Sequence, residues 1–379
     1  MRVVVGISGG IAAYKVPELI RMLRKAGNEV KVATTKNALE FVTPLTLQTL
    51  SGHPVYSDVF AAINEHSTEH ISLPDWADVM VIAPATANVL GKMAHGIADD
   101  ALTTTFCAMR KPVVIVPAMN DKMYDSPAVQ DAIRTLSQWS NITMLDCAEG
   151  ELACGSTGKG RMQEVDVIYD AIQAALTPKT LAGKRVVITA GPTIEKIDPV
   201  RYISNFSTGK MGRALATECR HRGAEVTLIM GAISAREMYE QTMKTWETAD
   251  IAILAAAVAD YRPEVEFTEK IKKESQANTA MSLALTENPD IAAALGQNKR
   301  PEQLLVGFAL ETNDEEQHAL SKLTRKNMDW IVLNSLQDKG AGFGCDTNKV
   351  TLYSRTGAKK DVPLQSKEDV AKAILDSIL

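Results

Sequence analysis

The sequence has 379 residues with 41 basic and 46 acidic side chains, and its formal net charge at pH 7 is −5. This length exceeds the roughly 250–300 residues at which single cores stop growing, so we expect two domains. The charges are mixed and form no long basic patch, so we expect no nucleic-acid partner. No apolar run approaches the roughly 20 residues that span a bilayer, and no signal peptide is evident. We therefore expect a soluble, cytoplasmic protein with no membrane partner.

The cysteine pattern argues against disulfides and against structural zinc. Five cysteines occur, with no C-x-x-C pair among them: Cys107, Cys147, Cys154, Cys219 and Cys345. An odd number without metal-ligand spacing predicts neither a disulfide framework nor a zinc site. We expect these residues to be buried thiols, or one of them to be a catalytic thiol.

Short apolar runs recur in the first half, as in strands covered on both faces: 3–6, 30–34, 79–83, 113–116 and 142–145. Amphipathic segments, which we expect to be helices, lie at 12–26, 127–139 and 165–176. This alternation predicts an α/β fold with a doubly wound, three-layer, parallel sheet. In such a sheet ligands bind at the carboxyl ends of the strands, so the residues after each run are the candidate site.

Polar loops follow four of these runs and are expected to converge on one crevice. Their candidate cofactor-binding residues are Gly9, Gly10, Ile11, Thr34, Thr35, Ala85, Thr86, Asn88 and Met119. The first loop lacks the full G-x-G-x-x-G spacing, so it indicates a phosphate contact without demonstrating a dinucleotide. The same absence argues against an NAD-dependent dehydrogenase.

Residues 184–212 open a second nucleotide-binding pattern halfway along the chain. An apolar strand at 186–189 is followed by a loop rich in Gly, Ser and Asn, and then by an expected helix at 211–220. Gly209 and Gly212 are expected to let an anion approach the positive end of this helix.

The second half continues as another three-layer, doubly wound, Rossmann-like α/β domain. Its expected strands and final helix lie at 186–189, 226–230, 251–256, 304–309, 331–334, 350–353 and 367–379. A stretch of Pro, Gly and small polar residues at 178–183 is typical of a linker. We therefore expect domains at 1–177 and 184–379.

Five motifs in the first half are GISGGIAAYK, EHISLPDWAD, PATAN, PAMNDKMY and ACGSTGKGRM. In this order they resemble the flavin-dependent cysteine decarboxylase family, whose fold is flavodoxin-like or Rossmann-like. The resemblance implies FMN as cofactor and a trimer with FMN between subunits. It further implies that His70 is the base or carboxylate partner, Asn120 binds the substrate carboxylate, Cys154 donates a proton and Arg161 contacts substrate.

The second half contains AGPTIEKIDPVRYISNFSTGKMG, AAAVADYRP, EKIKK, ENPDI, VGFALET and RKNMDWIVLN, and resembles phosphopantothenate–cysteine ligase. The resemblance implies CTP, Mg²⁺, 4′-phosphopantothenate and cysteine as ligands, an acyl-cytidylate intermediate and dimerising domains. Asn205 and Lys270 are then the catalytic candidates. The substrate and nucleotide candidates are Arg201, Gly209, Asp260, Pro289, Asp290, Ile291, Phe308, Lys322 and Lys326. No D-x-D cluster marks the metal ligands, which stay unknown.

Both halves together are similar to the bifunctional coenzyme A biosynthesis proteins of bacteria. The resemblance implies that phosphopantothenoylcysteine, made by the second half, is decarboxylated to 4′-phosphopantetheine by the first. The fold alone leaves a flavin-binding, non-catalytic or regulatory module open as the alternative. A prenyl-FMN synthase-like transferase shares the first-half fold but has no ligase half.

Overall fold

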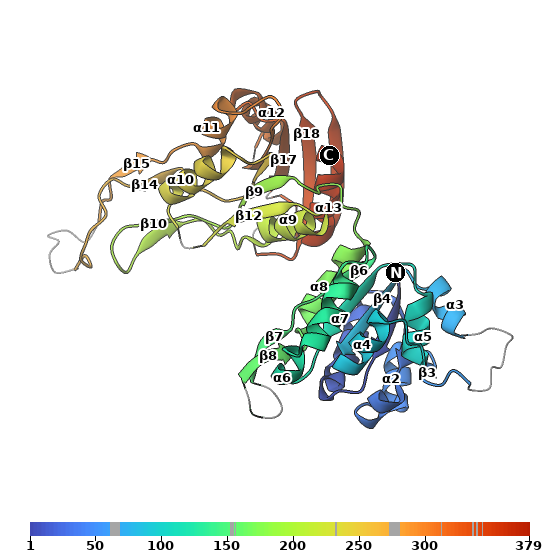
Figure 1. The fold of residues 1–379 in the computed structure, drawn as a ribbon. Coiled ribbons are helices and arrows are strands. Elements are labelled where there is room, and N and C mark those ends of the chain that lie inside the picture. The colour runs from blue at the N-terminus through green and yellow to red at the C-terminus, as the bar shows by residue number, and fades with distance from the viewer. Residues whose placement is uncertain are drawn as a thin grey trace. The chain divides into compact units, whose positions relative to one another are not determined.

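The computed structural model describes residues 1–60, 69–151, 155, 157–231, 233–272, 281–311, 313–335, 337–338, 340–342 and 344–379, with the side chain of Glu151 left out. The chain forms two compact units, Met1–Thr177 and Pro178–Leu379. Each unit has helices packed on a parallel or largely parallel sheet, as the colours of Figure 1 allow the reader to follow. The α/β fold class predicted from the sequence is confirmed.

The first unit is built on a six-stranded parallel sheet in the order β3-β2-β1-β4-β5-β6. The strands are β1 (Arg2–Ile7), β2 (Glu29–Thr34), β3 (Val55–Tyr56), β4 (Val79–Ala85), β5 (Val113–Pro117) and β6 (Ile142–Met144). After β1 the chain adds β2 and β3 on one side of β1, and it then adds β4, β5 and β6 on the other side. The direction in which strands are added therefore reverses between β1 and β4. In doubly wound sheets this switch point is where ligands bind.

Helices cover both faces of this sheet. Successive side chains of a strand point to opposite faces, so a strand made of consecutive apolar residues must be covered on both. Val3 and Val5 pack with one group of helices, and Val4 packs with the other. The helical segments are η1 (Ile11–Lys15), α1 (Val16–Lys25), η2 (Lys36–Glu40), α2 (Pro44–Ser51), α3 (Glu69–Trp76), α4 (Ala87–Ala94), α5 (Ala101–Ala108), α6 (Asp121–Tyr124), α7 (Pro127–Ser137) and α8 (Val165–Leu176). An antiparallel hairpin of β7 (Ala148–Glu151) and β8 (Thr157–Arg161) precedes α8.

The second unit has a seven-stranded sheet in the order β12-β9-β13-β16-β17-β18-β19. Its strands are β9 (Arg185–Thr189), β12 (Glu225–Ile229), β13 (Ile251–Leu254), β16 (Leu304–Glu311), β17 (Trp330–Ser335), β18 (Thr347–Ser354) and β19 (Lys359–Ser366). The first five strands in spatial order run parallel to one another. β18 pairs in antiparallel fashion with both of its neighbours, β17 and β19. Two apolar cores lie on the two faces of this sheet.

The helices of the second unit separate by face. The core on one face contains residues of α9 (Lys210–His221) and α13 (Lys367–Ile378). The core on the other contains residues of α10 (Ala235–Trp246), α11 (Ile291–Gln297) and α12 (Glu315–Arg325). The segment 178–183 belongs to this unit, because Leu181 is buried in the first of these cores and its N–H donates to the Arg222 carbonyl.

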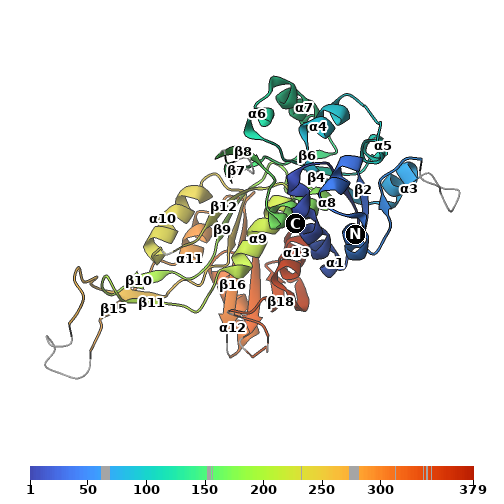
Figure 2. The same cartoon turned by 90° about the horizontal axis from the view of Figure 1, so that it is seen from below.

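Two antiparallel ribbons extend from the second unit. One pairs β10 (Ile194–Lys196) with β11 (Tyr202–Ser204), and the other pairs β14 (Tyr261–Pro263) with β15 (Leu285–Glu287). Both views of the chain show the ribbons projecting beyond the end of the seven-stranded sheet (Figures 1 and 2).

Candidate functional site

A cavity of about 1080 Å³ lies at the switch point of the first unit. Loops that follow β1, β2, β4 and β5 line it, because the carboxyl ends of parallel strands meet at one edge of the sheet. The predicted cofactor residues in its wall are Gly9, Gly10, Ile11, Thr35, Thr86, Asn88 and Met119. The cavity is large enough for a cofactor-sized ligand.

Ser8 fixes the two loops nearest the switch point to each other. Its hydroxyl is fully buried, donates to the Pro84 carbonyl at 2.7 Å and accepts from the Thr86 N–H at 3.0 Å. The loop after β1 is therefore tied to the loop after β4, and Ser8 Oγ also lies at hydrogen-bond distance, 3.1 Å, from Thr86 Oγ1. Thr86, held in this way, and Asn88 both line the cavity.

Two of the predicted cofactor residues, Thr34 and Ala85, are the last residues of β2 and β4 and do not line the cavity. Both are fully buried. Within the described part of the chain, Thr34 Oγ1 and the Tyr56 hydroxyl oxygen are buried without a hydrogen-bond partner. Hydroxyl and amide donors beside the apolar Ile11 and Met119 fit a flat, phosphorylated cofactor.

Asn120 lines the same cavity from the N-cap of α6. Its Oδ1 accepts from the Lys122 N–H at 3.0 Å, so the helix fixes the direction of the side-chain amide. Met119 and Gly160 join this loop to the β7–β8 hairpin through a 2.9 Å backbone hydrogen bond.

Two cations share one carboxylate at the cavity wall. Arg161 Nη2 lies 2.6 Å from Glu164 Oε1, and Lys15 Nζ lies 3.1 Å from Glu164 Oε2. The hydrogen bond from Lys15 is the main cause that lowers the pKa of Glu164. Sequence reasoning singled out Arg161 but missed Lys15, which belongs to the GISGGIAAYK motif and also lines the cavity. Phosphate and carboxylate groups are the natural ligands of such a pair of cations.

The remaining decarboxylase candidates are not brought into this cavity by the described residues of one chain. His70 is half-buried in the first turn of α3 and is not part of the cavity wall. Cys154 lies outside the described residues. Of the other thiols, Cys147 and Cys219 are buried as expected, and burial raises the pKa of each to about 12. Cys107 is exposed, which corrects the expectation of a buried thiol, because this part of α5 faces solvent.

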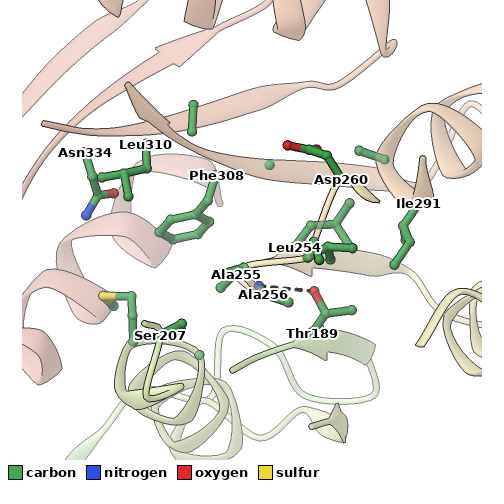
Figure 3. Close-up of a pocket in the computed structure, with 18 of the residues that line it drawn as sticks. Thr189, Ser207, Leu254, Ala255, Ala256, Asp260, Ile291, Phe308, Leu310 and Asn334 are labelled. Atoms are coloured by element: carbon green, nitrogen blue, oxygen red, sulfur yellow. Dashed lines mark hydrogen bonds between the residues drawn. The ribbon is translucent and has the colours of Figure 1, made fainter. Parts of the chain in front are cut away.

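A second cavity, of about 620 Å³, lies in the second unit. Figure 3 shows Thr189, Asp260 and Phe308 around it, with the Ala256 N–H donating to Thr189 Oγ1 at 3.4 Å. Residues of β9, β13 and β16 therefore meet at one end of the sheet, as in the first unit. The predicted residues that line this cavity are Gly209, Asp260, Pro289, Asp290, Ile291, Phe308, Lys322 and Lys326.

The N-terminus of α9 opens onto this second cavity. Gly209 is its N-cap, with a φ of 74° and no side-chain cap, so N–H groups of the first turn stay available to an anion. Gly212 also lines this cavity, and it has a packing role that the sequence did not predict. A Cβ at this position would lie 2.3 Å from the Cβ of Ala190, so Gly212 permits α9 to pack against the end of β9.

Lys322 and Lys326 are held on the cavity wall by carboxylates. Lys322 Nζ lies 2.6 Å from Glu311 Oε1, and Lys326 Nζ lies 2.9 Å from Asp290 Oδ2. Burial alone would raise the pKa of Asp290, but hydrogen bonds from the Ala293 N–H and from Lys326 lower it overall. Asp290 also caps α11, so one carboxylate positions both a helix and a lysine.

Sequence reasoning missed a third lysine, Lys367, which lines the cavity from the start of α13. It is buried, and Nζ donates to the carbonyls of Gly342, at 3.1 Å, and Cys345. Burial lowers the pKa of Lys367. No motif singled out Lys367, because a lysine in a C-terminal helix is expected to be solvated.

Three ligase candidates, Arg201, Asn205 and Lys270, do not line this cavity. Asn205 Nδ2 donates to the carbonyl of the wall residue Ala257 at 2.9 Å. Arg201 pairs with the buried Asp198, and Lys270 is exposed on the segment that follows β14. The structure thus brings the nucleotide candidates together in one cavity wall, whereas Arg201, Asn205 and Lys270 lie on segments that adjoin the two ribbons.

Neither a metal-binding cluster nor a membrane-spanning helix occurs among the described residues. They contain no group of three or more His, Cys, Asp or Glu side chains that could hold a metal ion. They also contain no helix that is long and apolar enough to cross a membrane.

Comparisons with known proteins cover the whole chain. The flavoprotein family matches residues 1–177, and the family described as DNA/pantothenate metabolism flavoprotein C-terminal domain matches residues 181–379. The coenzyme A biosynthesis bifunctional protein CoaBC of Bacillus subtilis (strain 168) is 47% identical over 98% of this chain and 95% of its own length. A cysteine/cysteine sulfinic acid decarboxylase of an unknown prokaryotic organism is 46% identical over 89% of this chain and 99% of its own.

A solved structure, the C-terminal domain of a coenzyme A biosynthesis bifunctional protein CoaBC, is 38% identical over 53% of this chain and 96% of that one, with a TM-score of 0.43. Each family match covers one of the two units, each of which contains one cavity, and the full-length relative covers both units. The chain therefore belongs to the CoaBC family of bifunctional coenzyme A biosynthesis enzymes, with phosphopantothenoylcysteine decarboxylase and phosphopantothenate–cysteine ligase activities.

Proposed function

We propose that residues 1–177 bind FMN and decarboxylate phosphopantothenoylcysteine, and that residues 184–379, joined through 178–183, make this compound from 4′-phosphopantothenate, cysteine and CTP. The observation that carries the proposal is the pair of cavities at the carboxyl ends of the two sheets. One is lined by Asn120 and the Gly9–Ile11 loop, and the other by the α9 N-terminus and the α12 lysines.

In the first cavity FMN, when bound, supplies reversible two-electron oxidation of the sulfur-bearing carbon, which lets the neighbouring carboxylate leave as carbon dioxide. Thr35, Thr86 and Asn88 hold the cofactor. Asn120 donates its amide N–H to the substrate carboxylate, since its Oδ1 is engaged by the helix it caps. His70 acts as base or carboxylate partner, and Cys154 donates the final proton.

Free cysteine is the second candidate substrate, because one relative is a cysteine/cysteine sulfinic acid decarboxylase. The ligase unit favours phosphopantothenoylcysteine, since it produces that compound within the same chain. Lys15 and Arg161 share one carboxylate, that of Glu164, so two cations at the cavity wall can bind a phosphorylated ligand.

In the second cavity the N–H groups at the start of α9 and the side chains of Lys322 and Lys326 bind the nucleotide. Asp260 and Phe308 grip its ribose and base. Attack of the 4′-phosphopantothenate carboxylate on the α-phosphate of CTP releases pyrophosphate and forms the acyl-cytidylate, which the cysteine amine then opens. Lys270 neutralises charge that develops on the phosphate, while Asn205 and Arg201 hold the acyl side.

Mg²⁺ accompanies the triphosphate in this proposal. The absence of a metal-binding cluster among the described residues is consistent with an ion bound through phosphates and waters, which is the usual mode for Mg²⁺.

The proposed assembly is a homo-oligomer with trimeric decarboxylase units and dimerising ligase units. Large apolar side chains support both contacts. Ile11, Tyr14 and Phe60 are exposed at the flavin cavity, and Tyr202 and Phe206 are exposed at the β10–β11 ribbon. A site that draws His70 from a neighbouring chain also explains why one chain does not bring it into the cavity.

The ligase assignment predicts that Lys270→Ala and Asn205→Ala block different steps. Lys270→Ala should slow pyrophosphate release about 1,000-fold, because a cation at the α-phosphate is lost. Asn205→Ala should release pyrophosphate at close to the wild-type rate but convert the acyl-cytidylate slowly. The measurement is pyrophosphate release without cysteine, followed by product formation after cysteine is added.

The exposed Lys244 of α10 supplies the matched control, since Lys244→Ala removes a surface lysine of the same unit. It should behave as wild type in both assays. Equal loss of pyrophosphate release in the Lys270 and Asn205 variants would reject the division of roles.

A further inference from the structure

The segment that carries Lys270 is held by backbone contacts to a distant part of the sequence. The Phe267 N–H donates to the Ile197 carbonyl at 2.9 Å. The Ile271 N–H donates to Asp198 Oδ2 at 3.2 Å, and Arg201 Nη2 donates to the Ile271 carbonyl at 2.8 Å. Both polar backbone groups of the residue after Lys270 are therefore bound by one Asp–Arg pair.

Asp198 is the centre of this contact. Its side chain is fully buried, and it lies on the loop between β10 and β11. Oδ1 accepts from the N–H groups of Val200 and Arg201, both at 2.8 Å. Oδ2 accepts from Arg201 Nε at 3.0 Å, Arg201 Nη2 at 2.6 Å and the Ile271 N–H. Five hydrogen bonds thus converge on one carboxylate.

These bonds favour the ionised carboxylate. Burial alone would raise the pKa of Asp198, but the hydrogen bonds from Val200, Arg201 and Ile271 lower it to about 2. A carboxyl group whose pKa is lowered by folding keeps its hydrogen bonds at every pH above the pKa of the free side chain. It loses them as the pH falls through its pKa in the folded protein. The contact to Ile271 is therefore intact throughout the neutral range.

The Lys270 side chain has no such support of its own. It is exposed, and it forms no hydrogen bond or ion pair with other described residues. A lysine has about 2 kcal/mol of rotamer entropy, so its ammonium reaches a defined place only if the backbone beneath it is fixed. Asp198 supplies that fixed point and, through Arg201, connects it to the acyl side of the site.

We propose that Asp198 is a positioning residue of the ligase reaction, which holds the Lys270 segment against the Arg201 loop so that the lysine faces the reacting phosphate. This inference rests on the proposed role of Lys270. It goes beyond that role because Asp198 does not line the nucleotide cavity and therefore contacts no substrate bound there. Its effect is exerted on geometry alone.

The test is a double-mutant cycle on the full-length protein, with pyrophosphate release from CTP and 4′-phosphopantothenate measured without cysteine. Asp198→Asn preserves volume but removes the charge, and should lower kcat about 10- to 100-fold, as expected for a displaced catalytic group. The KM for CTP should stay close to wild type, because Lys322 and Lys326 are untouched. In the Lys270→Ala background Asp198→Asn should have almost no further effect.

Glu195→Gln is the matched control. Glu195 is also buried, lies on β10, and accepts from the Ala235 N–H at 2.9 Å without contacting the Lys270 segment. Any effect of Glu195→Gln should multiply with that of Lys270→Ala. If the effects of Asp198→Asn and Lys270→Ala also multiply, Asp198 is a structural residue only and the inference fails. If Lys270→Ala releases pyrophosphate normally, the proposed role of Lys270 fails instead.

Hydrogen exchange keeps the inference testable if Asp198→Asn does not fold. In the wild-type protein the Phe267 and Ile271 amides should exchange much more slowly than those of an unstructured peptide. Exchange at the unstructured rate would overturn the inference. In folded Asp198→Asn the Ile271 amide should lose this protection, whereas Glu195→Gln should retain it.

Discussion

Replacing Asn120 by aspartate is expected to lower phosphopantothenoylcysteine decarboxylation about 1,000-fold, the size of effect seen when a donor to a reacting group is removed. The variant keeps the shape of the side chain and the oxygen that accepts from the Lys122 N–H, so α6 stays capped. It exchanges the amide N–H₂ for a second oxygen. Like charges then oppose each other where the substrate carboxylate binds.

Ligation in the Asn120→Asp protein should be unchanged, because the second cavity lies in the other unit. Asn141→Asp is the matched control: it adds the same charge to the first unit at a residue whose amide donates to the Lys111 carbonyl, away from the cavity. The measurement is carbon dioxide release from phosphopantothenoylcysteine. Near-normal release by Asn120→Asp would remove Asn120 from carboxylate binding.

Replacing Gly296 by alanine is expected to destabilise the ligase unit by about 3 kcal/mol, a typical cost of overpacking. A Cβ at this position in α11 would lie 1.9 Å from the Lys326 carbonyl oxygen and 3.1 Å from Asn327 Cβ. Backbone cannot move aside cheaply, so the end of α12 must shift and carry Lys326 away from Asp290. Ligation should therefore fall even at temperatures where the unit is folded.

Gly91 provides the matched control, because it is also a helical glycine but has nothing within 4 Å of an added Cβ. Gly91→Ala should stabilise the first unit by up to about 1 kcal/mol through helix propensity. Thermal inactivation of each activity, measured separately on the same sample, reports each unit. For units of this size about 1 kcal/mol shifts the midpoint by roughly 2–4 °C. Unchanged ligase inactivation in Gly296→Ala would show that α11 and α12 separate easily.

The parallel strands could be predicted because burial on both faces leaves near-continuous apolar runs, as in β1 and β9. The edge strand β19 of the second sheet could not. β19 has one buried residue, Val362, followed by Pro363, and its other side chains are polar or exposed. An edge strand of this kind resembles a loop in sequence, because only half of its hydrogen bonds and little of its surface are internal.

Two of the predicted cofactor residues differ by one position from residues that line the cavity. Thr35 and Thr86 line the first cavity, whereas Thr34 and Ala85, one position earlier, end buried strands. The loop contacts depend on where each strand stops, and an apolar run does not show that. Lys15 and Lys367 were missed for another reason: a lysine on a helix is usually solvated, and only tertiary packing reveals that these two border the cavities.

We expect one chain to carry out both reactions in succession. The most direct test incubates the purified full-length protein with FMN, Mg²⁺, CTP, 4′-phosphopantothenate and cysteine, and identifies the products by mass. The expected product is 4′-phosphopantetheine, formed only when CTP is present, from a protein with a flavin absorbance spectrum. Accumulation of phosphopantothenoylcysteine without decarboxylation, or cysteamine formed from cysteine alone, would contradict it.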